Sequence, residues 1–575
     1  MFQRLGVLFG VVVLLGCRSP LTATVDEQLR EQLLATQRAY RKAMDEGPYV
    51  QVKRAPSEVE QKLEKENRIE ELDKMSGLEA LRHKPLELGE DLLGREKSDV
   101  LTISLQTAVE QAIRYNIDLK SARYLPAIAQ SQVTQAMAVF DAEFFVNFDW
   151  TKIDDPQGIV GGGVTETTAM ETGVRKQLSS GGQVQLTTSF QRVSQTASPF
   201  LPPLFYDANI DVSVTQPLLR NLGTDVNRAQ IVLSQNAENA AVEELRRAAI
   251  ETALGVERQY WALVNSIHRL RVQNHLYKMT VIDWRTLKER EGFDVSPVRL
   301  TQAASFVEIR RGEVIRARQQ VRIESDRLKR LIGSPDLPIT GETLLLPVDE
   351  PPTAPVEFSL YDAVMTALKT RPEMKQALLG ISDASVRQRI ADNQRLPQLD
   401  LTAAIGYNGS DDGLGGASGT MLDGDFIDYI IGVDFSVPIG NRGPEAFYRQ
   451  RQIERQQAVV DYRREAQDVV LEVKEAMRQL MTAYELIGAA RASRRAAADN
   501  VRAIQVQMDE GVKLTPEFLL DQKLNAQERL ADAEIQEMEA MTTYNTSIAN
   551  LYRSMGTLLQ RNRIEFDPRP PTDRQ

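Results

Sequence analysis

The chain has 575 residues, a formal net charge of −11, one cysteine, three histidines and 6% aromatic residues. A single cysteine excludes disulfides within the chain and makes a Cys/His zinc site difficult to build. The acidic balance provides no basic surface for nucleic acid, which we exclude as a partner. No apolar run of about eighteen residues follows the N-terminus, so no transmembrane helix is expected. Two classes of structure remain: soluble domains, or a β-barrel, whose alternating strands are not detected when hydropathy is averaged over a window.

Residues 1–16 have the features of an export signal. Arg4 supplies a positive charge, residues 5–15 are apolar but too short to cross a bilayer, and Gly16 precedes Cys17. Because a lone thiol is unusual in an exported protein, its position at the cleavage site is informative. The segment resembles a bacterial lipoprotein signal, which implies a lipid anchor on Cys17. An ordinary signal peptide with an incidental cysteine is the alternative.

From residue 103 onward the chain looks duplicated. Residues 17–102 form a charged N-terminal extension and linker, expected to contain short helices. The predicted first repeat spans residues 103–333, a linker residues 334–357, the second repeat residues 358–556 and a tail residues 557–575. The matching segments are Ile103-Ser104-Leu105 with Phe358-Ser359-Leu360, and Glu291-Gly292 and Ser296-Pro297 with Glu510-Gly511 and Thr515-Pro516.

Each repeat is predicted to contain a helix, strands, a long helix, a tight turn and another helix. Ser104 and Ser359 are N-cap candidates, and a hydroxyl residue followed by proline restarts a helix after each turn. The predicted helices are 104–139, 227–291, 297–332, 359–396, 445–510 and 516–555. The long helices would reach roughly 100 Å at about 1.5 Å per residue, so two shorter helices laid end to end match each of them.

A heptad seam along residues 466–487 predicts a neighbouring helix packed on the second long helix. An ordinary coiled coil or helical bundle explains this seam equally well. The strands are what such a bundle does not explain.

Alternating apolar and polar residues predict strands with one apolar face. Runs of about nine residues suit a tilted strand that crosses hydrocarbon, with aromatic residues near the interfaces. A soluble β-sandwich also alternates, so the pattern alone does not decide between the two. The residues predicted to face the membrane are Phe144, Val146, Phe148, Trp150, Tyr429, Ile431, Val433 and Phe435.

The sequence allows either four or six strands. A strand over 399–408 is predicted in the second repeat and one over 210–215 in the first. Two further candidates in the first repeat, 172–178 and 183–192, would raise the count from four to six, which we favour. Residues 161–163 and 411–419 are expected to be outer loops. Four carboxylates lie in or near the second of these segments, and we interpret them as parts of flexible acidic loops, with calcium binding as the alternative: Asp411, Asp412, Asp423 and Asp425.

This order of elements resembles the TolC-type outer-membrane efflux family over residues 103–556, with Gln216-Pro217-Leu218-Leu219 and Val437-Pro438-Ile439-Gly440 leading from strand to helix. The resemblance implies a mainly α protein with β structure: a duplicated helix–strand–helix protomer that forms a trimeric transmembrane β-barrel continued by a long periplasmic α-helical barrel. It also implies an outer-membrane homotrimer without a cofactor, supplied by a periplasmic adaptor (membrane fusion protein) and an inner-membrane transporter. Independently of the family, four or six strands cannot close a barrel, so copies must associate in lipid.

The resemblance further implies a periplasmic gate and a docking surface at the turns between helices. Lys513 lies where the family commonly has an arginine, Glu517 where it often has a pore-ringing aspartate, and Asp521 one residue beyond the second ring position, Leu520. Carboxylates near an axis repel one another and favour cations unless Lys513 neutralises them, whereas solvated charges at a helix start are the simpler alternative. The residues that match the adaptor-docking tips are Gly292, Val295, Ser296, Gly511, Leu514 and Thr515.

Two other function classes, an enzyme and a structural protein, agree less well with the sequence. No histidine accompanies a serine or cysteine nucleophile motif, so we do not expect an enzyme. His268 and His275 are seven residues apart and can share a helix face, but solvated or hydrogen-bonded histidines are the simpler interpretation than a ligand pair. A periplasmic coiled-coil adaptor or structural lipoprotein is the alternative function; it predicts one helical hairpin with its β region outside, whereas here strands interrupt each repeat.

Overall fold

The computed structural model describes residues 50–51, 56–82, 84–94, 99–155, 163–196, 202–291, 295–509 and 516–567. The chain divides into two compact units. Residues 126–241 and 376–463 belong to the first unit, and residues 35–125, 242–375 and 464–575 to the second. Each unit combines segments from both predicted repeats, whose boundaries stay a prediction.

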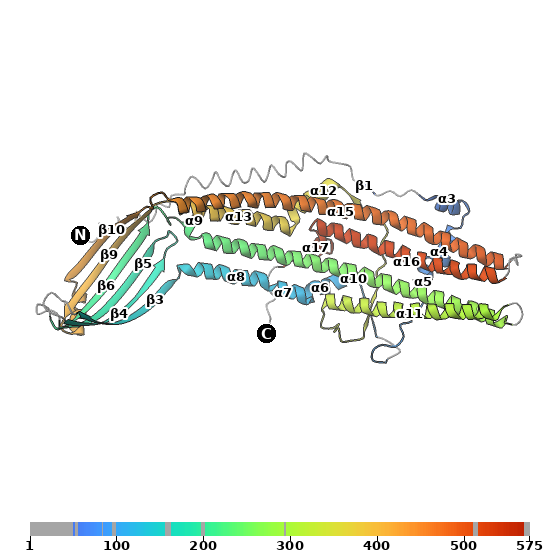
Figure 1. The fold of residues 1–575 in the computed structure, drawn as a ribbon, viewed down its shortest axis with the longest axis horizontal. Helices are drawn as coiled ribbons and strands as arrows, with labels where there is room; N and C mark the ends of the chain where they lie inside the picture. The colour runs from blue at the N-terminus through green and yellow to red at the C-terminus, as the bar shows by residue number, and fades with distance from the viewer. Residues whose placement is uncertain are drawn as a thin grey trace. The chain divides into compact units, whose positions relative to one another are not determined.

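The first unit contains a six-stranded sheet in the order β10-β9-β6-β5-β4-β3, in which all neighbours are antiparallel (Figure 1). The favoured count of six is therefore confirmed. Strand β4 begins about nine residues earlier than predicted because its polar first half pairs with β3 although it has no apolar alternation of its own. The strands are β3 (Ala142–Asp155), β4 (Gly163–Gln177), β5 (Gln183–Gln195), β6 (Leu204–Pro217), β9 (Gln398–Asp411) and β10 (Phe426–Ser436).

The prediction of an outer loop at residues 411–419 is wrong. Asp411 ends β9, and residues Leu414–Asp423 form helix α14, which ends at Gly424 in the left-handed conformation (φ 74°). Four glycines and serines lower the intrinsic helix propensity of this segment, but packing of Ala417 and Met421 against the sheet stabilises it. Gly163 begins β4, and residues 161–162 lie outside the described residues.

The long helices and those that follow the tight turns are confirmed. Helix α10 (Ala229–Glu289) is followed by α11 (Pro297–Ile332), and α15 (Arg442–Asp509) by α16 (Pro516–Ser554). A short helix, α9 (Thr224–Asn227), precedes α10. No helix within the described ranges is both long and apolar enough to cross a membrane.

The helices that open the repeats are broken, unlike the predicted continuous ones. In the first, α6 (Leu105–Tyr115), α7 (Ile117–Ala122), α8 (Tyr124–Met137) and the 3-10 turn η1 (Ala138–Phe140) follow one another. Buried Asn116 causes the first break: its side chain accepts a hydrogen bond from the Leu119 amide and donates one to the Leu331 carbonyl. In the second, α12 (Leu360–Thr370) and α13 (Pro372–Asn393) are separated by extended Arg371, as expected before a proline.

The predicted caps at the starts of α6 and α12 are confirmed. The Ser104 hydroxyl accepts a hydrogen bond from the Thr107 amide, and the Ser359 hydroxyl accepts one from the Asp362 amide. Ser296 occupies the N-cap of α11 before Pro297, but its side chain makes no capping hydrogen bond.

The second unit packs around a core in which Tyr260 and Leu263 of α10 are fully buried. The core also includes α11 and α6. Strand β2 (Val100–Ile103) pairs in parallel with β7 (Leu344–Pro347), and β1 (Val50–Gln51) pairs antiparallel with β8 (Glu357–Phe358). The short helix α17 (Leu558–Arg561) adds Leu558 and Leu559 to the core.

The heptad seam of α15 faces inward as predicted. Five of its residues, Ala466, Val473, Met477, Leu480 and Ile487, are buried. Tyr484 contacts Tyr544 of α16, with ring centroids 5.4 Å apart. Helix α16 is therefore a neighbour that the seam packs against.

Candidate functional site: an amphipathic sheet and the ends of two helical hairpins

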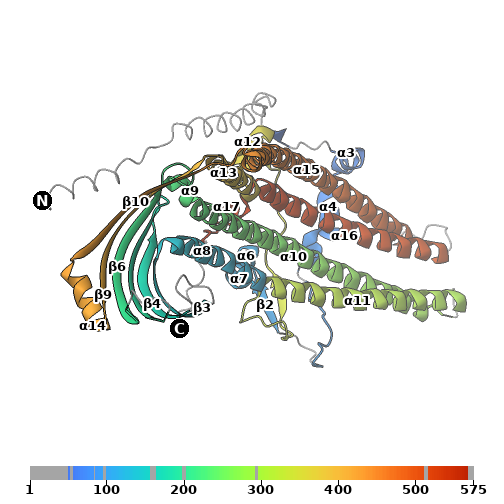
Figure 2. The ribbon, with the colours of Figure 1, turned by 60° about the vertical axis from the view of Figure 1, so that its left-hand side comes forward.

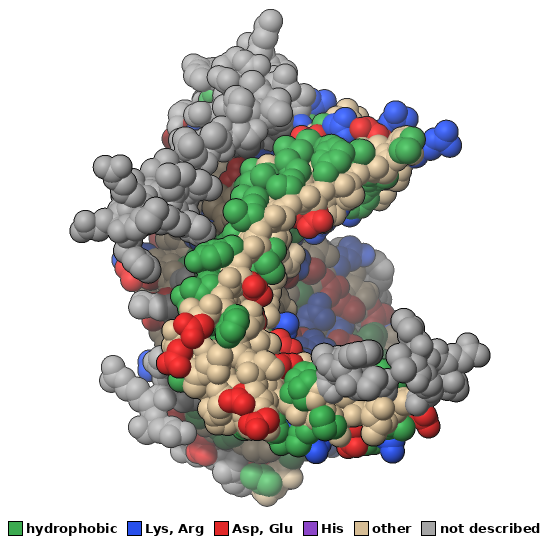
Figure 3. Space-filling view, turned by 90° about the vertical axis from the view of Figure 1, so that its left-hand side faces the viewer, with side chains coloured by type: hydrophobic (Ala, Val, Ile, Leu, Met, Phe, Trp, Pro, Cys, Tyr) green, Lys and Arg blue, Asp and Glu red, His purple; other side chains and the backbone are tan. Residues whose placement is uncertain are grey.

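The six-stranded sheet has one continuous apolar face. Residues directly opposite each other on antiparallel strands point to the same side, so a row of paired residues can be followed from edge to edge. One such row consists of large apolar residues, each at least 40% exposed: Phe144, Val174, Leu186, Val212, Ile405 and Tyr429. Figure 3 shows hydrophobic side chains gathered along one side of the sheet.

All eight residues predicted to face the membrane lie on this apolar face. Phe144, Val146, Phe148 and Trp150 alternate along β3, and Tyr429, Ile431, Val433 and Phe435 alternate along β10. The row above joins the two sets across four intervening strands, and each of the eight is more than half exposed. The structure thus brings together residues that are almost 300 positions apart, while their contact with lipid stays a prediction.

The opposite face of the sheet is mostly polar. One row is polar on five strands, as Asn147, Glu171, Ser189, Asn209 and Asn408, and ends at Phe426 on β10. Neighbours in it share hydrogen bonds, such as Asn209 Nδ2 to Ser189 Oγ at 3.3 Å. Such a face suits contact with water, so the sheet is amphipathic.

Both edges of the sheet are open. Strand β3 pairs only with β4, and β10 pairs only with β9 among the described residues. Each edge therefore presents a row of backbone amide and carbonyl groups without a strand partner.

The turns between the long helices hold the predicted gate and docking residues, only some of which the structure describes. Gly292, Gly511, Lys513, Leu514 and Thr515 lie outside the described residues. Val295 forms an isolated bridge with Glu291, and Ser296 is exposed at the start of α11. Glu517 lies in the first turn of α16, and its side chain is not described.

Asp521 is the predicted gate residue whose contacts are described. Its carboxylate forms an ion pair with the Arg299 guanidinium of α11. Two turns into α16, Lys523 Nζ lies 2.8 Å from Asp283 Oδ1 of α10, and both side chains are nearly buried. Gln527 Nε2 donates to the second oxygen of Asp283 at 3.2 Å.

These contacts tie α16 to both helices of the first hairpin, α10 and α11. Arg310 of α11 adds a further ion pair, 2.8 Å from Glu528. The sequence pointed to Asp521 but not to Arg299, Asp283 or Lys523, because charged residues on polar helices carry no signal for partners more than 200 positions away. Breaking a nearly buried pair such as Asp283–Lys523 leaves an uncompensated charge, which costs about 3–5 kcal/mol.

Residues 57–82 of the predicted N-terminal extension form three short helices on the second hairpin; we name them the N-terminal clasp. They are α3 (Glu58–Lys65), α4 (Ile69–Ser76) and α5 (Leu78–Arg82), and they confirm the expected short helices. Leu63 and Leu72 pack with Ala498 of α15. Leu81 packs between α10 and α16 in a second small core.

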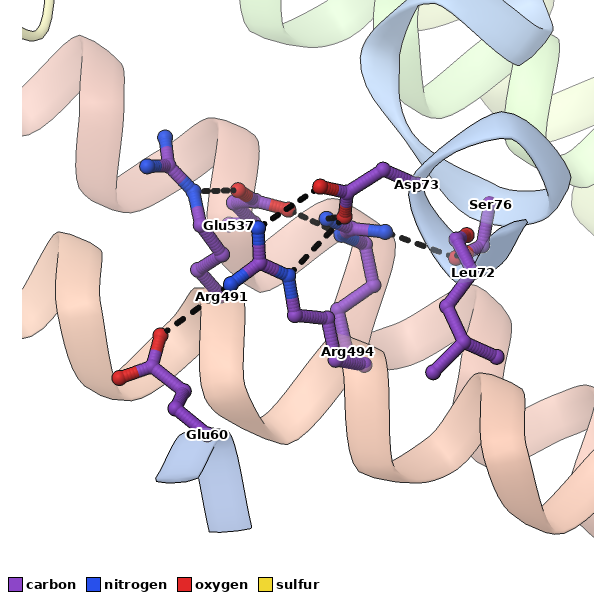
Figure 4. A network of polar contacts seen from close by, with 8 residues as sticks. Glu60, Leu72, Asp73, Ser76, Arg491, Arg494 and Glu537 are labelled. Carbon is purple, nitrogen blue, oxygen red and sulfur yellow. Dashed lines mark hydrogen bonds and ion pairs between the residues drawn. The ribbon is translucent and has the colours of Figure 1, made fainter. Parts of the chain in front are cut away.

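A buried polar network fastens the clasp (Figure 4). Arg494 of α15 is 4% exposed at its side chain and pairs with Glu537 of α16, which is 5% exposed. The same guanidinium donates to Ser76 Oγ at 2.8 Å and to Asp73 Oδ1 at 2.7 Å. Arg495 Nη2 lies 2.7 Å from Asp73 Oδ2. Burial alone would raise the pKa of Asp73, but hydrogen bonds from Arg495 and Arg494 hold it below its ordinary value.

Both histidines of α10 that the sequence singles out have lowered pKa values. Burial lowers the pKa of His268 from 6.5 to about 4. Burial, together with the charges of Lys84 and Lys278, lowers the pKa of His275 to about 4, and Lys84 Nζ lies 2.9 Å from its Nδ1. Burial also raises the pKa of Glu534 from 4.5 to about 8.

Within the described ranges, no three side chains of the His, Cys, Asp and Glu types come together as a metal site. The histidine pair therefore has no third ligand there, and no three of the carboxylates Asp411, Asp412, Asp423 and Asp425 come together. Asp411 and Asp423 instead end β9 and α14.

Residues 363–557 match a family model described as "Outer membrane efflux protein". No curated protein sequence matches the chain. The match of the family model covers the second predicted repeat from α12 onward.

Solved outer-membrane channels have the same fold. The chain is similar to the Campylobacter jejuni CmeC outer membrane channel, with 17% identity, a TM-score of 0.57 and coverage of 82% of this chain and 92% of that one. It is similar to CusC, with 14% identity, a TM-score of 0.58 and coverage of 82% and 96%. It is also similar to the Neisseria gonorrhoeae MtrE outer membrane channel, with 16% identity, a TM-score of 0.56 and coverage of 81% and 91%.

These similarities span both units of the chain, whereas the family model spans only its C-terminal part. The chain is a helix-rich mixed α/β protein with the fold of these channels. The resemblance to the TolC-type outer-membrane efflux family is thereby confirmed.

Proposed function

We propose that the protein is an outer-membrane efflux channel made of three copies of this chain. The observation that carries the proposal is the six-stranded sheet, with one apolar face, one polar face and two open edges. In lipid each unpaired backbone group costs several kcal/mol, so the edges must find partners. Pairing β10 of one copy with β3 of the next closes a ring around a polar lumen.

Three copies of six strands make a barrel of eighteen strands. With strands about 4.8 Å apart and tilted by about 40°, its backbone diameter is about 36 Å, compared with about 24 Å for twelve strands. The apolar positions of β9 run from Leu399 to Gly409. At about 3.4 Å per residue and the same tilt they cover about 26 Å, close to the apolar band of about 25 Å in outer-membrane barrels.

The proposal includes a tripartite system. By likeness to the family, a periplasmic adaptor docks on the turns at Gly292, Val295, Ser296, Gly511, Leu514 and Thr515, and an inner-membrane transporter supplies the substrate. The channel itself conducts passively and needs no cofactor. Lipid on Cys17 would hold each copy to the outer membrane, with a large part of the chain in the periplasm.

The gate is proposed at Lys513, Glu517 and Asp521, at the start of α16. The ion pair of Asp521 with Arg299 and that of Lys523 with Asp283 hold this end of α16 against α11 and α10. Opening the entrance requires α16 to move away from the first hairpin, and this movement breaks both pairs. The gate would then close through attraction within each copy in addition to any repulsion among the Glu517 side chains.

Fractionation followed by planar-bilayer recording tests the function. We expect the full chain in the outer membrane, released by detergent as a trimer that conducts ions after reconstitution. A water-soluble monomer without conductance would refute the channel and favour the alternative of a periplasmic coiled-coil adaptor or structural lipoprotein. Cross-linking in cells, followed by identification of the captured adaptor and transporter, tests the partners separately.

A further inference from the structure

Helix α14, between β9 and β10, is a feature that the channel function does not require. It lies beside β9 in Figure 2. Its inner face is well packed: Ala417 and Met421 are buried with Ala208 of β6 and contact half-buried Phe190 and Tyr206. A Cβ atom at Gly409 would lie 2.1 Å from the Ala417 carbonyl oxygen, so β9 needs glycine where the helix crosses it.

The register places α14 on the apolar face of the sheet. Gly409 pairs with Ala208, Ala208 with Phe190, Phe190 with Met170, and Met170 with Phe148. These residues form one row, and directly paired residues point to the same side. The helix therefore covers the face that carries Phe148 and Tyr429, not the polar face.

The exposed residues of α14 are glycines, two leucines and one aspartate. Its ten residues, LGGASGTMLD, include one charged residue, Asp423, at the last position. Leu414 is 47% exposed and Leu422 is 74% exposed. A surface helix in water normally carries charged and polar residues opposite its buried stripe, whereas the residues opposite Ala417 and Met421 here are glycines, with Leu422 beside them.

We propose that α14 is a lipid-contacting helix, in which Leu414 and Leu422 meet the acyl chains of the outer leaflet. This inference rests on the proposed function, because it takes the apolar face of the sheet to be the membrane face. Lipid is the occupant that fits: the exposed leucines continue the apolar face, and within the helix only Asp423, its last residue, is charged, while the Asp411 carboxylate lies against Gly416 in the first turn.

The depth of the helix follows from the rows that it covers. Tyr206, which packs against α14, pairs with Arg192 and Asp411, so the row beyond Ala208 is already partly polar. Trp150 belongs to this same row on β3. Aromatic and charged side chains gather where hydrocarbon meets head groups, so α14 would lie at the outer boundary of the hydrocarbon and not at its centre.

The test uses variants with one introduced cysteine that carries a fluorophore, in proteoliposomes containing lipids brominated on their acyl chains. Leu422→Cys reports on α14, Ile431→Cys on the apolar face of the sheet, and Ser189→Cys on its polar face. The wild-type chain, treated with the same reagent, measures any signal from Cys17. We expect both Leu422 and Ile431 to be quenched, and Ser189 to remain unquenched. Bromine placed near the head group should quench Leu422 more than bromine near the chain end.

The outcomes separate the two proposals. Quenching at Ile431 without quenching at Leu422 or at a second site, Leu414→Cys, would overturn the inference while the channel stands. The absence of quenching at both Ile431 and Leu422 would refute the membrane position of the sheet and the proposed function with it. A cross-link from Leu422→Cys to another protein, without quenching by lipid, would also overturn the inference, because a protein and not lipid would then cover the helix.

Discussion

The N-terminal clasp provides a sharp test of how the helices are held together. Leu72 of α4 is fully buried against Leu63 and Ala498, with Ile69 and Leu530 at the edge of the cluster. Leu72→Ala removes an isopropyl group from this cluster, and truncations of this kind cost about 2–5 kcal/mol in protein cores. The cost falls on attachment of the clasp, because Leu72 is one of the clasp residues that contact α15.

A loss of about 3 kcal/mol raises the population of the detached clasp about a hundredfold, since each 1.4 kcal/mol is roughly a factor of ten. Hydrogen exchange followed by mass spectrometry measures this population through the backbone amides of α3, α4 and α5. We expect these amides to exchange faster in Leu72→Ala by about that factor. Amides in the middle of α15 should keep their protection, because the helix retains its heptad seam.

Met75→Ala is the matched control. Met75 lies in the same helix, α4, but is 40% exposed, so its truncation should leave exchange nearly unchanged. Unchanged exchange over residues 57–82 in Leu72→Ala would refute the reasoning. Equal acceleration in both variants would refute it as well, because the effect would then not depend on burial.

Three further predictions concern the gate, the anchor and the buried titratable groups. Replacing Arg299 and Asp521 together by alanine, or Lys513 and Glu517 together, should raise single-channel conductance in planar bilayers. Replacing the exposed pair Arg311 and Glu308 of α11 by alanine is the control and should leave conductance unchanged. Unchanged conductance in both gate variants would remove the gate assignment. Cys17→Ser should abolish metabolic labelling with palmitate, and labelling that persists would overturn the anchor. His268 and His275 have pKa values lowered to about 4, so the free energy of unfolding should fall as pH drops from 6.5 toward 4. Glu534 has a pKa raised to about 8, so the free energy of unfolding should fall as pH rises from 4.5 to 8. Resistance to denaturant should therefore peak near pH 6.5, and Glu534→Gln should remove the decline above it; a decline that persists in this variant would contradict the assignment.

The elements of the fold were predictable where their signal is local. Period-two alternation located β3 and β10, and a hydroxyl residue followed by proline located the start of α11. Local patterns did not reveal β4 at its full length or α14, because both depend on neighbours that are distant in sequence. The broken helix at Asn116 is of the same kind, since its side chain bonds to Leu331, 215 residues away.

The residues of the site divide in the same way. The apolar character of Phe144 and Tyr429 could be predicted from alternation, but their place on one face depends on register through four other strands. Arg494 lies in a charged stretch that looks solvent-exposed in the sequence, yet the clasp buries it against Glu537. Its burial requires contacts more than 400 residues away, such as that with Asp73, which no local pattern encodes.

The proposed barrel and the proposed gate would have different tasks. A ring of eighteen strands about 36 Å across is too wide for its polar lining to select solutes by size. Under the proposed function, selection and closure would fall to the ends of the helical hairpins, where Asp283 and Lys523 lie nearly buried. Breaking such a pair is costly, because separation leaves an unpaired charge in a poorly hydrated place. The proposed gate would therefore open only when something else stabilises the separated helices, and an adaptor docked at the proposed turns would supply that stabilisation.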